Sequence, residues 1–78
     1  MDTIKDTVER LRLKTEIFKK ENKAIFIKDF NNTYYFCNII SIEIDYIIIY
    51  NFKGKRSGER DKILWLDIKE LEKYKERE

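Results

Sequence analysis

Five cations lie close together between positions 53 and 62 of this 78-residue chain. They are Lys53, Lys55, Arg56, Arg60 and Lys62. The same segment holds both glycines of the chain, and glycine lets a backbone approach a ligand closely. Because lysine and arginine contact nucleic-acid phosphates, the segment predicts a loop that binds the backbone of RNA or DNA with little sequence preference. The alternative is a solvated hairpin loop that keeps a sheet edge from pairing.

Aromatic residues flank this loop and add a second means of binding nucleic acid. Tyr50 and Phe52 precede the loop, and Trp65 follows it. Unpaired bases stack on such rings where the rings are exposed. We therefore include Tyr50 with the five cations in a candidate nucleic-acid site.

The residue types give little support to enzymatic chemistry. The chain has no histidine, so the usual general base is absent, and one cysteine without histidine cannot form a metal cluster. Glu43 and Asp45 would share a strand face, but polar caps of a turn explain them better than paired acid–base groups do. The glycines lack the Gly-Lys-Ser/Thr ending of a phosphate loop. The sequence thus predicts a non-enzymatic binding module with no catalytic residue, cofactor, metal or small-molecule substrate.

Length and composition predict one domain with a modest core. The single cysteine, Cys37, lies in an apolar run, which is typical of a small core residue. The longest apolar run, Tyr46–Tyr50, is too short to span a bilayer, and no basic and apolar leader opens the chain. We therefore expect no membrane partner and a cytoplasmic location. The bias toward isoleucine and lysine fits either a thermophilic source or an AT-rich genome.

Residues 1–22 show the spacing of an amphipathic helix. Apolar side chains and one threonine recur at steps of three and four, at Ile4, Val8, Leu11, Thr15 and Phe18. Thr3 followed by Asp6 is typical of a helix start, and Asn22 of a helix end. We expect the helix face formed by Val8, Leu11 and Phe18 to be buried on four residues of the strands: Phe36, Ile40, Ile42 and Trp65.

From residue 23 to residue 74 the apolar period changes to two, which is typical of β-strands. We expect strands over residues 24–30, 33–44, 46–52 and 63–66. Asn31-Asn32 predicts the first hairpin turn, because asparagine tolerates a positive φ. Two interpretations of the end stay open: a helical turn at 67–70 that continues as a helix, or that turn followed by a short fifth strand over 71–74. Residues 75–78 should fray.

The run from Phe36 to Asp45, leading into Tyr46–Tyr50, resembles the second and third strands of the Sm-like family. The resemblance implies a mainly β (α+β) fold: an N-terminal helix, then a small, strongly bent, antiparallel SH3/Sm-like barrel of four or five strands with a short C-terminal helical turn. It also implies ring-like assembly. Asn38 stands where the family prefers glycine, Ile44 where it prefers aspartate, and Leu64-Trp65 replaces its Arg-Gly step. The family's base-holding residues therefore do not carry over.

The strand predicted at 46–52 is apolar on both faces, so it needs two layers of cover. A helix and a barrel interior supply one solution, in which this strand lies in the core of a monomer. Pairing of strand edges between copies supplies another. We predict a homo-oligomer, either a dimer or a closed ring, joined at least partly by strand addition. The alternative to nucleic-acid binding is therefore a protein-interaction or self-assembly module with no nucleic-acid role. The predicted interface residues are Ile48, Tyr50, Ile63, Leu64 and Trp65.

Overall fold

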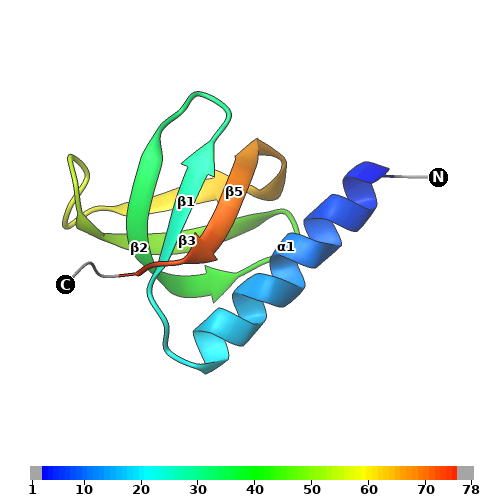
Figure 1. Ribbon diagram of the computed structural model, residues 1–78, viewed down its shortest axis with the longest axis horizontal. Coiled ribbons are helices and arrows are strands. Elements are labelled where there is room, and N and C mark those ends of the chain that lie inside the picture. Colours follow the sequence, from blue (N-terminus) through cyan, green and yellow to red (C-terminus); the bar gives the residue numbers. More distant parts are fainter. Residues whose placement is uncertain (1–2, 76–78) are drawn as a thin grey trace.

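The computed structural model describes residues 3–75, with one helix and five strands (Figure 1). The elements follow in the order α1 (Thr3–Lys20), β1 (Ile25–Asp29), β2 (Tyr34–Ile42), β3 (Tyr46–Lys53), β4 (Arg60–Leu64), a 3-10 turn η1 (Trp65–Asp67) and β5 (Ile68–Lys73). The tail at 76–78 and the side chain of Ile4 lie outside the described part. No described helix has the length and apolar character to span a membrane.

The five strands form one antiparallel sheet in the order β4-β3-β2-β1-β5. The predicted barrel is corrected on one point, because the described strands do not close the sheet: β4 and β5 are its two edges. The turn η1 carries the chain from one edge to the other, where β5 pairs with β1. Helix α1 contacts β2, η1 and β5, and so covers the core beside this crossing (Figure 1).

The end of α1 follows the prediction from Asn22. This residue has a φ of 55°, and its N–H donates to the carbonyl of Lys19 at 3.1 Å. The N–H of Lys23 donates to the carbonyl of Phe18 at 2.9 Å. These two bonds make a Schellman motif, in which a left-handed residue satisfies the last carbonyls of a helix. The chain then turns directly into β1.

The first hairpin turn is also confirmed. The carboxylate of Asp29 accepts hydrogen bonds from the backbone N–H groups of Asn31 and Thr33, both at 2.9 Å. Asn32 has a φ of 63°. Asp29 therefore stabilises the turn by the side-chain-to-backbone bonding that short polar residues favour.

The core lies on the concave, inner face of the sheet, under α1. Its apolar members are Ile25, Ile27, Cys37, Ile47, Ile49, Ile63, Trp65, Ile68 and Leu71. Val8, Leu11 and Phe18 pack against this cluster, as predicted, and so does Ile42. Cys37 is fully buried, which confirms the prediction of a core residue.

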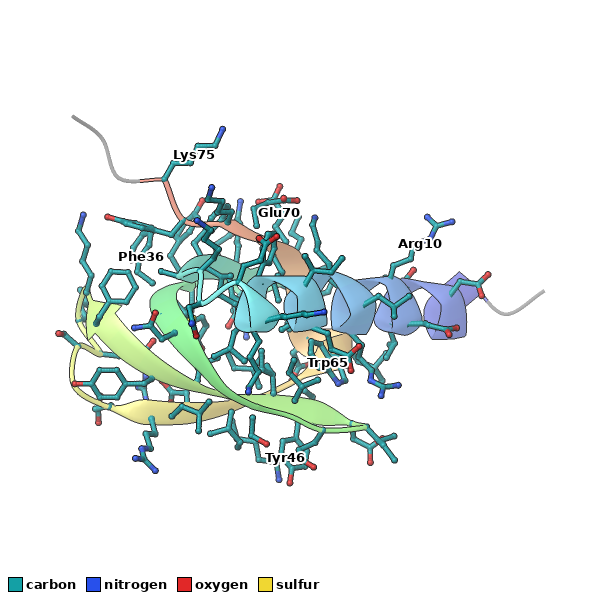
Figure 2. All side chains as sticks on the ribbon, turned by 90° about the horizontal axis from the view of Figure 1, so that it is seen from below. Arg10, Phe36, Tyr46, Trp65, Glu70 and Lys75 are labelled. Atoms are coloured by element: carbon teal, nitrogen blue, oxygen red, sulfur yellow. The ribbon has the colours of Figure 1, made fainter. Side chains whose placement is uncertain are left out.

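Two of the expected partners of the helix face, Phe36 and Ile40, lie outside the core cluster. The backbone register of β2 and β3 shifts between Ile39 and Ser41, so Ile40 falls at a bulge and is 36% exposed. Phe36 lies on the outer face, because its neighbour Cys37 points into the core. Figure 2 shows Phe36 away from the helix and Trp65 beneath it. A simple alternation of two cannot reveal a bulge, and this is why the sequence misassigned these residues.

The last strands also differ from their predicted limits. Strand β4 begins three residues earlier than expected, at Arg60, and the helical turn begins at Trp65 rather than at residue 67. A fifth strand does follow, so the second interpretation of the chain end is the one observed. Strand β5 runs from Ile68 to Lys73 beside β1, with Leu71 opposite Ile27.

Candidate functional site

The basic loop between β3 and β4 is tightly held by backbone hydrogen bonds. The N–H of Gly58 donates to the carbonyl of Asn51 at 2.7 Å, and the N–H of Asn51 donates to the carbonyl of Glu59 at 2.9 Å. Gly54 and Gly58 have φ values of 91° and 90°, which few other residues adopt without strain. The loop is therefore a defined turn that fixes where its cations point.

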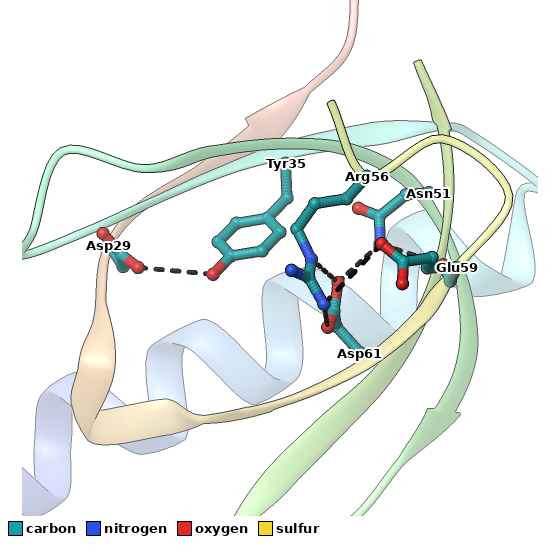
Figure 3. Close-up of polar contacts among 6 residues, drawn as sticks. All are labelled: Asp29, Tyr35, Asn51, Arg56, Glu59 and Asp61. Carbon is teal, nitrogen blue, oxygen red and sulfur yellow. Dashed lines mark hydrogen bonds and ion pairs between the residues drawn. The ribbon is translucent and has the colours of Figure 1, made fainter. Parts of the chain in front are cut away.

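Arg56 points back onto the sheet and forms a bidentate ion pair with Asp61 (Figure 3). Its Nε and one terminal nitrogen lie 2.7 and 2.5 Å from the two carboxylate oxygens. The side-chain amide of Asn51 donates to Asp61 at 2.7 Å and to the carbonyl of Glu59 at 2.9 Å. Hydrogen bonding from Arg56 holds the pKa of Asp61 below its usual value. Arg56 is thus already paired with an anion.

Other polar groups on the inner face are also occupied or buried. The hydroxyl of Tyr35 donates to Asp29 at 3.4 Å, and burial together with the charges of Asp29 and Asp61 raises the pKa of this phenol. Burial raises the pKa of Cys37 to about 12, so its thiol stays protonated and unreactive at neutral pH. Asn51 is 1% exposed. Asn51 therefore holds the loop, Tyr35 is bonded to Asp29, and the buried thiol of Cys37 is not an accessible nucleophile.

The remaining predicted cations lie on or beside the outer face. The ammonium nitrogen of Lys53 lies 5.8 and 5.7 Å from the ring centres of Phe36 and Tyr74, and 3.2 Å from the Tyr74 hydroxyl. The ammonium nitrogen of Lys62 lies 4.5 Å from the ring centre of Tyr46. Such cation–π contacts position a charge over an aromatic surface. Lys55 is exposed on the loop.

Tyr50 is 41% exposed and stands in a cross-strand row on the outer face. It pairs with Arg60 on β4 and with Asn38 on β2. The structure therefore brings Tyr50, Arg60 and Lys62 to one surface, with Lys53 at the far end of β3. Trp65 does not join them. Its side chain is 1% exposed, and its indole N–H donates to the carbonyl of Glu43 at 2.9 Å.

Four aromatic rings, of which the sequence singled out only Phe52, extend this surface across the sheet. Tyr34 and Phe36 are nearly parallel, with ring centres 6.5 Å apart. Tyr74 meets Phe36 and Phe52 edge to face, at 5.7 and 5.3 Å. We call Tyr34, Phe36, Phe52 and Tyr74 the aromatic strip. Alternation along β2 could have grouped Tyr34 with Phe36, but nothing local could place Tyr74 beside Phe52.

The predicted interface residues are divided between surface and core. Leu64 is 44% exposed, and Ile48 is half-buried on the outer face. Ile63 and Trp65 are 6% and 1% exposed, so both side chains belong to the core. The larger exposed apolar feature is a groove of about 630 Å³ between α1 and the end of β4. Its lining includes Val8, Ile44, Leu64, Trp65 and Leu66.

The acidic pair at the β2–β3 turn behaves as a turn cap. The N–H of Glu43 donates to the carbonyl of Tyr46 at 2.9 Å, and the Glu43 carboxylate accepts from the hydroxyl of Ser41. The carbonyl of Asp45 accepts from the N–H of Trp65 at 3.1 Å. Within residues 3–75 no cluster of cysteine and carboxylate side chains has the arrangement of a metal site.

No protein-family model matches the chain, and no curated protein matches it in sequence.

Proposed function

We propose that this chain is a non-enzymatic module that binds single-stranded RNA or DNA on the outer face of its sheet. One observation carries the proposal: cations and partly exposed aromatic rings alternate on that face. Tyr50 and Arg60 form a cross-strand pair, and Lys62 lies over Tyr46. Lys53 lies over the aromatic strip. Proteins that bind single strands combine cations that track the backbone with rings on which bases stack.

The charge distribution supports the same face. Arg60 and Lys62 alternate along β4 with Asp61, whose carboxylate turns inward to Arg56. Lys28 adds a cation over the ring of Tyr34, at 5.4 Å. The acids of this sheet face lie on β5, where Glu72 is paired with Lys14 of the helix at 2.5 Å. The positive side of the face therefore runs along β3 and β4.

The exposed rings favour a single strand over a duplex. Tyr34 and Tyr50 are 51% and 41% exposed, so a flat ligand can reach part of each ring. Bases inside a duplex are already stacked on one another and offer only their edges. Unpaired bases can stack on aromatic side chains, and each stacked base contributes about 1–3 kcal/mol.

Fluorescence anisotropy with labelled single-stranded RNA and DNA at about 50 mM salt tests the proposal. The double variant Lys53→Ala/Lys62→Ala should weaken binding. It should also reduce the slope of log affinity against log salt concentration by about 0.7 for each phosphate that the variant no longer neutralises. The variant Lys19→Ala/Lys20→Ala removes the same charge from exposed positions near the end of α1 and should bind almost normally. Absence of binding by the unmodified protein to RNA and DNA alike would refute the proposal.

A second candidate function is self-association, and the apolar groove is the observation that favours it. Ile44, Leu64 and Leu66 are 75%, 44% and 62% exposed around this groove, next to the unpaired edge of β4. A second copy could add a strand to that edge and cover the groove. Leu64→Lys should then reduce the mass found by sedimentation equilibrium. A monomer at high micromolar concentration would contradict this candidate and leave nucleic-acid binding untouched.

A further inference from the structure

Two clefts flank Tyr74 on the outer face of the sheet. The first, of about 470 Å³, is lined by Ala24, Asn38, Phe52, Lys53 and Tyr74. The second, of about 480 Å³, is lined mainly by the rings of Phe26, Tyr34, Phe36 and Tyr74. Ligand sites are hollows of this size with apolar walls and a few polar groups that fix orientation. The clefts share Tyr74, so two neighbouring flat groups could occupy them together.

The first cleft combines aromatic walls with one amide. Phe52 and Tyr74 meet edge to face with ring centres 5.3 Å apart. Asn38 is exposed, and its side chain makes no hydrogen bond with any described residue. An asparagine amide presents a donor and an acceptor side by side, the pattern that pairs with N6 and N7 of adenine. The cleft therefore has the groups to stack a base and to distinguish its edge.

The second cleft is almost entirely aromatic. The rings of Tyr34 and Phe36 are within 8° of parallel, so a base that stacks on one is parallel to the other as well. Lys73 and Lys75 lie at the rim. The one acid of the lining, Glu72, is paired with Lys14 and therefore opposes a phosphate less than a free carboxylate would. This cleft offers stacking without a group that reads a base edge.

We infer that the outer face binds two successive bases of a single strand, one on each side of Tyr74, and that Asn38 selects adenine in the first cleft. This inference rests on the proposed function and narrows its ligand from any single strand to one with a base preference. Lys53 lies over both Phe36 and Tyr74, at 5.8 and 5.7 Å. A cation there can contact the phosphate that joins the two nucleotides.

Anisotropy with labelled oligo(A), oligo(U) and oligo(C) tests the base preference. The unmodified protein should bind oligo(A) most tightly. Asn38→Ala should weaken oligo(A) binding by about 5- to 150-fold and change the others less, because a bidentate amide–adenine pair discriminates to that extent. Asn38→Gln keeps the amide and should keep part of the preference. Lys55→Ala removes a charge outside both clefts. It should weaken the binding of all three oligonucleotides to the same extent.

A second measurement uses the unmodified protein and does not depend on how the variants fold. In a two-dimensional ¹H–¹⁵N NMR spectrum, the side-chain amide signals of Asn38 should shift on addition of oligo(A) and much less on addition of oligo(U). Equal binding of all oligonucleotides, with the Asn38 signals unmoved, would overturn the inference and leave the proposed function standing. Failure to bind any oligonucleotide would overturn both.

Discussion

The two faces of the sheet carry similar kinds of side chain and use them differently. On the inner face, Asn51, Arg56 and Asp61 satisfy one another beside a core that contains Trp65. On the outer face, Tyr50 and Arg60 stand in a cross-strand row and remain open to solvent. Residue types alone therefore do not distinguish a group that holds the fold from one that is available to a ligand. Pairing and exposure make that distinction.

The largest loss of stability should come from truncating a side chain of the core. Trp65→Ala removes a 1% exposed indole and leaves the carbonyl of Glu43 without its donor. Loss of a large buried aromatic residue costs about 3–5 kcal/mol, a large fraction of the stability of a small domain. Urea denaturation measures this cost. The matched control is Leu66→Ala, at a site that is 62% exposed, and its effect should stay within about 0.5 kcal/mol. Equal effects at the two sites would contradict the structural role that burial gives Trp65.

Removing the ion pair of the inner face should cost an intermediate amount of stability, and this cost should depend on pH. Asp61→Asn should cost about 1–3 kcal/mol near neutral pH, because Arg56 loses its charged partner and Asn51 a hydrogen-bond acceptor. The control is Glu59→Gln, because the Glu59 side chain is 59% exposed and its carboxylate lies 4.0 Å from Arg56. It should cost much less.

The pH dependence follows from the lowered pKa of Asp61. The unfolded chain takes up a proton at the usual carboxyl pKa of about 4, before the folded chain does. The stabilisation is therefore complete above that pH and is lost as the pH falls through the lower folded pKa. Denaturation series between neutral and acid pH should show a shallower acid loss for Asp61→Asn. An unchanged slope would indicate that the pair does not contribute to acid sensitivity.

On the outer face, truncation should affect binding more than folding. Tyr50→Ala should weaken single-stranded nucleic-acid binding by about 1–3 kcal/mol if one base stacks there, while the free energy of unfolding changes little. Phe30, which is 65% exposed at the first hairpin turn, provides an aromatic control outside the cross-strand pair of Tyr50 and Arg60. Phe30→Ala should leave binding unchanged. The same loss of affinity in both variants would show that the effect of Tyr50→Ala is not specific to its place on the outer face.

Much of the fold could be predicted from the residues because the determining signals are local. The three- and four-residue spacing of Val8, Leu11 and Phe18 placed the helix face correctly. Asn22 and Asn32 marked turns at which the backbone adopts a positive φ. Such features depend on side chains within a few positions of one another, so a single sequence contains them.

The parts that could not be predicted depend on contacts between distant segments. The bulge at Ile40 changes which face of β2 is buried, and it is defined only by pairing with β3. Tyr74 joins the aromatic strip because β5 pairs with β1, far away in the chain. Arg56 is a different case: Asp61 is only five positions away, but the loop between them, with Gly54 and Gly58 at positive φ, decides whether the two side chains meet. A count of charges in a segment cannot show which of them are already paired.

The smallest expected effect is on the salt dependence of binding, and it should differ between the cations of the basic loop. Arg56 is bound to Asp61, whereas the side chains of Lys55 and Arg60 make no ion pair with any residue between 3 and 75. A cation that contacts a phosphate releases counterions, so its loss lowers the slope of log affinity against log salt by about 0.7 on a single strand. Arg60→Ala should therefore shallow the slope by about this amount, and Arg56→Ala should leave it nearly unchanged although it weakens the fold. Anisotropy titrations at several salt concentrations, run where both variants are folded, measure the two slopes. A change of slope at Arg56 as large as that at Arg60 would mean that phosphate displaces Asp61, and the inner face would then take part in binding after all.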